Sequence, residues 1–238
     1  MTAARWAAVW ALAYNVLHHL GALPGGLGNA GGGTRWVDWI TLLTPYAVVG
    51  SAFAALRAAA ADRRGWTIAL VGAAMYVQGH GINVAANSIS NARGGAAPTH
   101  LWDEVVGHWL WYAGVALLVV SLAHAVDVAA RPAALVLAVA SGMTWTTNAL
   151  EGTTAVGSLT VAVALASWGW RRRTEGSGRL LLAAFGTSAA LLIAYGLWHM
   201  GFPAPSQLEG QAPLHAPATP GLCAASCGRL MPPGGSAA

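Results

Sequence analysis

The chain has 238 residues, of which 56% are hydrophobic and 8% are Asp, Glu, Lys or Arg, and its formal net charge is +4. A soluble domain carries about 25% charged residues, so this composition cannot cover a water-facing surface. It excludes an ordinary soluble enzyme, a module that binds nucleic acid, and a disordered protein. It predicts an all-α, multi-pass protein of the cell membrane whose partner is membrane lipid.

The apolar residues fall into long blocks. A membrane-spanning helix needs about 20 mostly apolar residues, and dividing the chain at charges, Gly and Pro gives seven such blocks: 6–23, 37–57, 66–90, 101–126, 132–150, 153–170 and 179–202. No strand alternation competes with this pattern, and a helix satisfies its own backbone hydrogen bonds in lipid. We therefore predict a bundle of about seven transmembrane helices over residues 1–202. A cleaved signal peptide is the alternative for the first block, because Arg5 precedes its apolar stretch.

The basic residues are all Arg, and their placement predicts the orientation of the bundle. Every second loop carries Arg, and the loops between hold only Arg35, only Arg93 or none. The loops of the first set contain Arg57, Arg63, Arg64, Arg131, Arg171, Arg172, Arg173 and Arg179. Arg and Lys concentrate in cytoplasmic loops. The N-terminus is therefore expected inside and the C-terminus outside.

Residues 203–238 differ in composition from the rest of the chain. They are rich in Pro, Gly and Ala, and such a segment buries too little apolar surface to order itself. We expect a flexible external tail. Its cysteines, Cys223 and Cys227, are either an external disulfide or an inert pair.

Polar side chains within the blocks gather toward the predicted external side, where five helices place them at similar depth. His80, Asn83 and Asn87 have the spacing i, i+3, i+7 of one helix face, and Glu104 and His108 are i and i+4. Polar groups inside a membrane are costly and are functional candidates. Together these stripes predict a polar cavity that opens on the external side.

The residue types in this cavity suit a divalent metal, most simply zinc, because imidazole and carboxylate groups are its ligands. Zinc-bound water loses its proton near neutral pH, which supports hydrolysis. We therefore predict a metal-dependent hydrolase that acts on a lipid or amphipathic substrate. The predicted metal ligands are His80, His108 and His199, the catalytic residues are Asp103, Glu104 and Asn83, and the substrate-binding residues are Asn87, Asn148 and Glu151.

Other functions fit the same residues. Histidines on different helices would serve as axial haem ligands in an electron-transfer protein, and a cluster of acids and histidines would also serve a proton-coupled transporter or sensor. A structural membrane subunit is a further alternative. His18 and His19 are expected either in an interfacial or structural role or in a functional one, because they end a helix. Most tryptophans, Trp10 and Trp111 included, are expected in an aromatic belt at the membrane surface.

Seven helices with this set of Asp and His residues resemble the membrane hydrolases that include alkaline ceramidases and progestin/adiponectin receptors. The resemblance lies in architecture and residue types, and it implies hydrolase activity with a histidine ligand at His80, an acidic residue at Asp103 and a last-helix histidine at His199. The paired histidines of that superfamily's last helix are absent, since only His199 occurs there. Tyr76 stands one turn before His80, where the superfamily has Ser.

Overall fold

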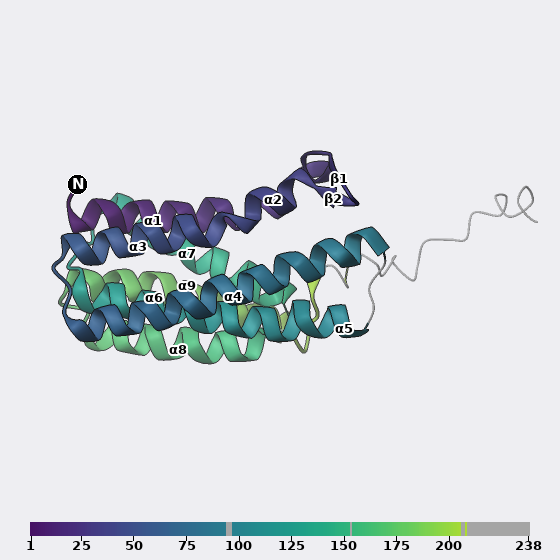
Figure 1. Cartoon of the computed structure of the whole chain (residues 1–238). Helices are drawn as coiled ribbons and strands as arrows, with labels where there is room; N and C mark the ends of the chain where they lie inside the picture. Colours follow the sequence, from purple (N-terminus) through teal and green to yellow (C-terminus); the bar gives the residue numbers. More distant parts are fainter. Residues whose placement is uncertain (94–96, 153, 206–207, 209–238) are drawn as a thin grey trace, which may run out of the picture.

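The computed structural model describes residues 1–93, 97–152, 154–205 and 208. Within these residues the chain is almost wholly helical (Figure 1). The α-helices are α1 (Ala3–Leu17), α2 (Trp36–Leu42), α3 (Thr44–Ala58), α4 (Arg63–Arg93), α5 (Ala97–His100), α6 (His108–Ala125), α7 (Pro132–Glu151), α8 (Ala155–Arg171) and α9 (Gly176–Trp198). Shorter elements are the 3₁₀ turns η1 (Leu20–Ala22) and η2 (Pro24–Leu27), the π-helical segment η3 (Leu101–Gly107), and the strands β1 (Asn29–Gly31) and β2 (Thr34–Arg35).

Five helical segments of the described chain are long and apolar enough to cross a membrane: Trp36–Ala58, Arg63–Ser90, Pro98–Ala125, Pro132–Glu151 and Gly176–Trp198. The prediction of a helical membrane protein is confirmed at this level. α1 has 15 residues and α8 has 17, fewer than the about 20 that a bilayer core of about 30 Å requires. A count of seven spans therefore stays a prediction.

The elements depart from the predicted blocks in three places. The first block extends to residue 23, but α1 ends at Leu17. The second block is interrupted at Leu43, because α3 begins anew with Pro45 in its first turn, and proline has no N–H to continue the preceding helix. Residues 29–35 form a short antiparallel hairpin where no strand was expected. Glycines with positive φ at its turn permit it, including Gly32 and Gly33.

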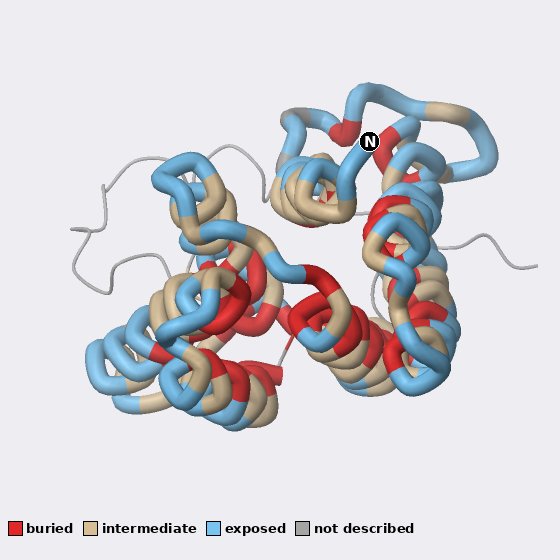
Figure 2. The backbone as a smooth tube through the Cα atoms, turned by 90° about the vertical axis from the view of Figure 1, so that its left-hand side faces the viewer, coloured by how far each residue is buried: buried red, intermediate tan, exposed pale blue. Residues whose placement is uncertain are grey.

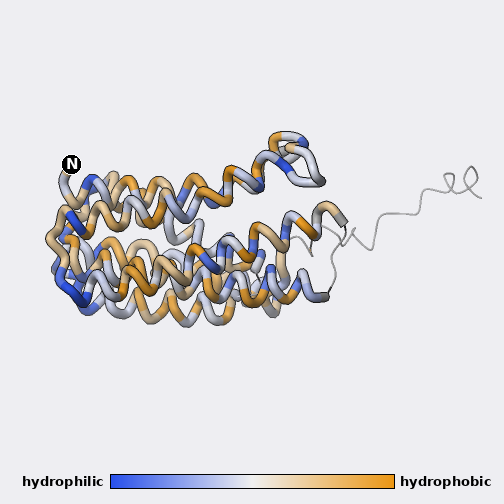
Figure 3. Tube along the Cα trace, in the orientation of Figure 1, coloured by the Kyte–Doolittle hydropathy of each residue, from blue (hydrophilic) through white to orange (hydrophobic). Residues whose placement is uncertain are grey.

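The arginine-rich loops all lie at one end of the bundle. The loops between α3 and α4, α6 and α7, and α8 and α9 meet at the end that holds the N-terminus, on the left of Figure 1. Hydrophilic residues colour this end blue in Figure 3. We call it the arginine-rich end, and the opposite end, which holds β1, β2 and η3, the hairpin end. The alternation of loops predicted from the sequence is thus present, and which end faces the cytoplasm stays a prediction.

Glycines let α4 and α6 approach closely. A Cβ atom at Gly79 would lie 2.4 Å from the Trp111 nitrogen of the main chain, and one at Gly114 would lie 2.3 Å from the Tyr76 nitrogen. Small residues permit such close helix packing. Buried residues line the inner faces of the helices in the end-on view of Figure 2. The contact fixes how α4 and α6 present their polar side chains to each other.

Candidate functional site

Three histidines from separate parts of the chain surround the indole of Trp111. The ring centroid of Trp111 lies 5.0 Å from that of His18, 4.8 Å from that of His80 and 5.4 Å from that of His108. His80 and His108 are 4% and 7% exposed, and Trp111 is 6% exposed. His18 caps the end of α1, His80 lies on α4, and His108 begins α6. We call these four residues the histidine cluster.

Each imidazole of the cluster has one ring nitrogen held by a backbone carbonyl. His18 Nδ1 lies 2.8 Å from the Tyr14 oxygen, His80 Nε2 lies 2.9 Å from the Thr41 oxygen, and His108 Nδ1 lies 2.7 Å from the Asp103 oxygen. A carbonyl only accepts, so these nitrogens carry the hydrogen. In a neutral ring the second nitrogen is then an acceptor.

The acceptor nitrogens of the cluster have different surroundings. His18 Nε2 accepts the hydroxyl hydrogen of Tyr76 at 2.8 Å. His80 Nδ1 is buried and has no hydrogen-bond partner among the described residues. The ring of His108 lies against Gly152, where a Cβ atom would come within 2.5 Å of Nε2. His80 therefore presents a buried acceptor nitrogen that no described side chain uses.

A carboxylate and an amide adjoin His108. The Asn83 amide donates to Asp103 Oδ1 and also lies 3.5 Å from His108 Nδ1. Asp103 belongs to the π-helical segment η3, whose wider turn lets its carbonyl reach the side chain five residues later. Such π-helical turns are frequent at functional sites. These three residues, the Asn83–Asp103–His108 group, were predicted to share one depth, and the structure brings them into contact.

The remaining predicted site residues lie around this group. Glu104 pairs with His100 Nδ1 at 3.0 Å and interacts electrostatically with Glu151 at the end of α7. Asn148 lies near the side chain of Tyr14. Asn87 lies on the exposed surface of α4, one turn beyond Asn83. These polar side chains therefore lie on or next to α4, α6 and α7, toward the hairpin end of the bundle.

His199 lies apart from the other two predicted metal ligands. It caps α9, and its ring packs on Tyr195 with a centroid distance of 4.4 Å. Across the residues that the structure describes, no three or more His, Cys, Asp or Glu side chains are grouped so as to hold a metal ion. Cys223 and Cys227, with most of the predicted tail, lie outside those residues.

The sequence pattern did not predict that Trp111 lies at the centre of the histidine cluster. The aromatic-belt interpretation is wrong for Trp10 and Trp111, which are 9% and 6% exposed. It suits Trp36, Trp102 and Trp198, which are at least half exposed. The available signal was spacing, because Trp111 follows His108 by three residues and so shares its helix face.

The fold and the site together define a class of protein: a helical protein with segments long and apolar enough to cross a membrane, and with a buried or half-buried group of histidines, an amide and a carboxylate toward one end. Comparison of the chain with models of protein families, with characterised proteins and with solved structures gives no match. Its function is therefore inferred from the geometry of the site.

Proposed function

We propose that the chain is an integral membrane hydrolase whose active site combines the Asn83–Asp103–His108 group with His80. The observation that carries this proposal is the pair of imidazoles, His80 and His108, each with one nitrogen held by a backbone carbonyl, together with the second nitrogen of His80, Nδ1, which is buried without a partner among the described residues. The proposed substrate is a lipid or amphipathic molecule that enters at the hairpin end. The resemblance to the seven-helix membrane hydrolases supports the same reaction type.

The arrangement of each imidazole suits two related roles. A histidine that binds a metal usually donates its other ring N–H to a carbonyl or carboxylate, which fixes the tautomer. The same arrangement presents a neutral nitrogen as a general base. A buried acceptor without a partner costs about 1–3 kcal/mol. A bound cation, water or substrate hydroxyl at His80 Nδ1 would remove that cost, which favours a ligand over mere packing.

We assign the roles as follows. His80 and His108 are the proposed ligands of a divalent cation such as zinc, which would supply an ionised water near neutral pH when bound. The described His, Asp and Glu side chains are not gathered around one point, so the cation would have to draw its ligands together. Asp103 is the proposed third ligand or general base, and Asn83 holds its carboxylate in place. His199 is left out of this set because its ring contacts Tyr195.

The residues around the group would bind the substrate. Glu151 and Asn87 are exposed at the hairpin end, while Asn148 is partly buried. These positions would meet the polar part of an amphipathic substrate, as the sequence predicts.

A haem-binding function is less compatible with the cluster. Trp111 packs directly against the rings of His18, His80 and His108. A porphyrin would have to displace this buried indole before two of these imidazoles reached one iron from opposite faces.

The test compares His108→Gln with His124→Gln in the purified full chain. His124 is a matched control, because it lies at the arginine-rich end, where it pairs with Asp62 and is 42% exposed. We measure bound zinc by mass spectrometry and hydrolysis of a panel of ester and amide lipids. Wild type and His124→Gln should bind zinc and hydrolyse a lipid, and His108→Gln should lose about 100-fold or more in rate.

Two outcomes would count against the proposal. Equal rates in the two variants would show that His108 takes no part in the reaction. Wild-type protein with neither bound metal nor hydrolysis across the panel would remove the hydrolase proposal as a whole, while hydrolysis without metal would leave His108 as a general base.

A further inference from the structure

A cavity of about 560 Å³ lies among α1, α6, α7 and α9 in the half of the bundle nearest the arginine-rich end. Its volume is within the range of about 300–1,000 Å³ that is typical of small-molecule sites. Its walls are almost entirely apolar, and the room comes from alanines of α1 and α7, among them Ala7, Ala11 and Ala138. This cavity is separate from the Asn83–Asp103–His108 group.

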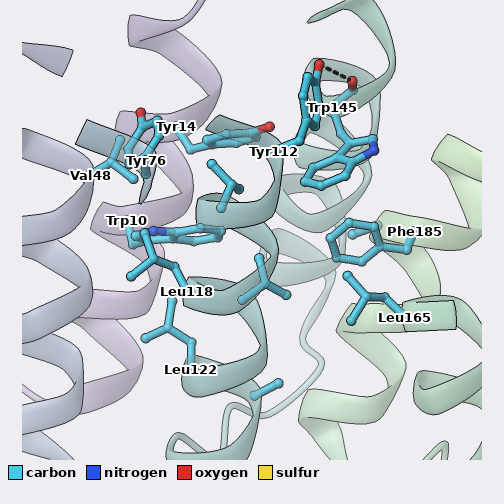
Figure 4. Close-up of a cluster of buried hydrophobic side chains, with 14 of the residues drawn as sticks. Trp10, Tyr14, Val48, Tyr76, Tyr112, Leu118, Leu122, Trp145, Leu165 and Phe185 are labelled. Carbon is cyan, nitrogen blue, oxygen red and sulfur yellow. Dashed lines mark hydrogen bonds between the residues drawn. The ribbon is translucent and has the colours of Figure 1, made fainter. Parts of the chain in front are cut away.

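Aromatic side chains bound the inner part of the cavity. Trp10 and Tyr14 of α1 line one side, and Trp145 of α7 and Phe185 of α9 line the other. Figure 4 shows these four side chains on either side of α6. Trp10 Nε1 is buried without a hydrogen-bond partner among the described residues.

The charges that line the cavity have one sign. Arg5 and Arg131 are its only charged lining residues in the described chain, and both are exposed. Neither takes part in an ion pair there. Asp127 lines an adjoining polar pocket with Arg172 and Glu175, and this pocket shares Ala123, Val126 and Ser177 with the cavity wall. An apolar cavity with two arginines at its mouth is complementary to an anionic amphiphile.

The length of the cavity fits one leaflet of a membrane. Arg5 and Tyr14 are nine residues apart on α1, which corresponds to about 14 Å along the helix axis. Half of the hydrocarbon core of a bilayer is about 15 Å thick. One acyl chain of one leaflet would therefore extend from the arginines to the aromatic side chains.

We propose that this cavity binds an anionic membrane phospholipid, with one acyl chain among α1, α6, α7 and α9 and the phosphate between Arg5 and Arg131. Guanidinium groups bind phosphate through paired, charge-assisted hydrogen bonds. The proposal is independent of the hydrolase proposal, because the arginines and the Asn83–Asp103–His108 group lie toward opposite ends of the bundle.

The first test measures lipid retention by native mass spectrometry. The full chain is released from nanodiscs that contain equal amounts of phosphatidylglycerol and phosphatidylcholine. Wild type should retain the anionic lipid preferentially, and Arg5→Gln/Arg131→Gln should lose that preference by about fivefold for each arginine. Arg57→Gln/Arg64→Gln is the matched control, because both residues are exposed near the same end and neither lines the cavity.

The second test fills the cavity without changing charge. Ala11→Phe places a ring where the acyl chain would lie, whereas Leu12→Phe adds its ring on the exposed side of α1, where Leu12 is 49% exposed. Ala11→Phe should retain less of both lipids than Leu12→Phe. Size-exclusion profiles of all variants report folding.

Several results would overturn the proposal. Equal retention of the two lipids by wild type would show that the cavity does not select an anionic headgroup. An equal loss in Arg57→Gln/Arg64→Gln would assign the preference to general surface charge, and unchanged retention by Ala11→Phe would place the lipid outside the cavity.

Discussion

The contact between α4 and α6 makes a quantitative prediction for Gly79→Ala. The added Cβ would lie 2.4 Å from the Trp111 nitrogen, 2.6 Å from the Gly107 oxygen and 2.9 Å from the Leu110 carbonyl carbon. All three are backbone atoms, which cannot rotate away. Non-bonded heavy atoms prefer about 3.5–4.0 Å, so α6 would have to move by roughly 1 Å.

The expected cost follows from two opposing terms. Overpacking in a filled interior costs about 1–3 kcal/mol, and this site lies at the upper end because main chain is displaced. Alanine regains up to about 1 kcal/mol of helix propensity over glycine. We expect Gly79→Ala to lower the free energy of unfolding by about 1–2 kcal/mol.

Gly81→Ala provides the matched control for this prediction. Gly81 is two residues along the same helix, and a Cβ there meets nothing within 4 Å. This variant should be neutral or more stable by up to about 1 kcal/mol. Both are compared by unfolding in mixed micelles of increasing SDS content. A Gly79→Ala protein at least as stable as Gly81→Ala would refute the close packing of α4 on α6 and, with it, the geometry of the histidine cluster.

Two further predictions concern the start of α4. Ser121 is fully buried and donates to the Gly65 oxygen at 2.7 Å, so Ser121→Ala should lower stability by about 1 kcal/mol in the same assay, and an unchanged midpoint would contradict the hydrogen bond. The pKa of the Asp62 carboxyl is lowered, chiefly by the hydrogen bond from the Gly65 N–H and also by nearby His124. The stability that this carboxylate contributes is therefore present above the ordinary carboxyl pKa and is lost as the pH falls through the lowered value. The thermal midpoint of wild type should accordingly decline more in that acidic range than the midpoint of Asp62→Asn. Parallel declines in the two proteins would argue against this role.

The sequence by itself determined the helical, membrane-protein character of the chain and the level of the polar groups along the helices. Hydropathy and length are local properties, so the blocks around α4, α6, α7 and α9 could be located from composition alone. Depth follows from residue count, because each helical residue advances about 1.5 Å. Asn83, Asp103 and His108 were accordingly predicted at one level, and they do meet.

Only the tertiary structure decided which of these groups face one another. Helix rotation and neighbours depend on where backbones approach closely, as at Gly79 and Gly114, which are 35 residues apart in sequence. That contact turns Trp111 inward between His80 and His108, although a tryptophan in an apolar block is compatible with a membrane interface. The early end of α1 at Leu17 brings His18 to the same indole. Hydropathy indicates whether a residue tolerates lipid or water, but it does not predict which faces of two helices are in contact.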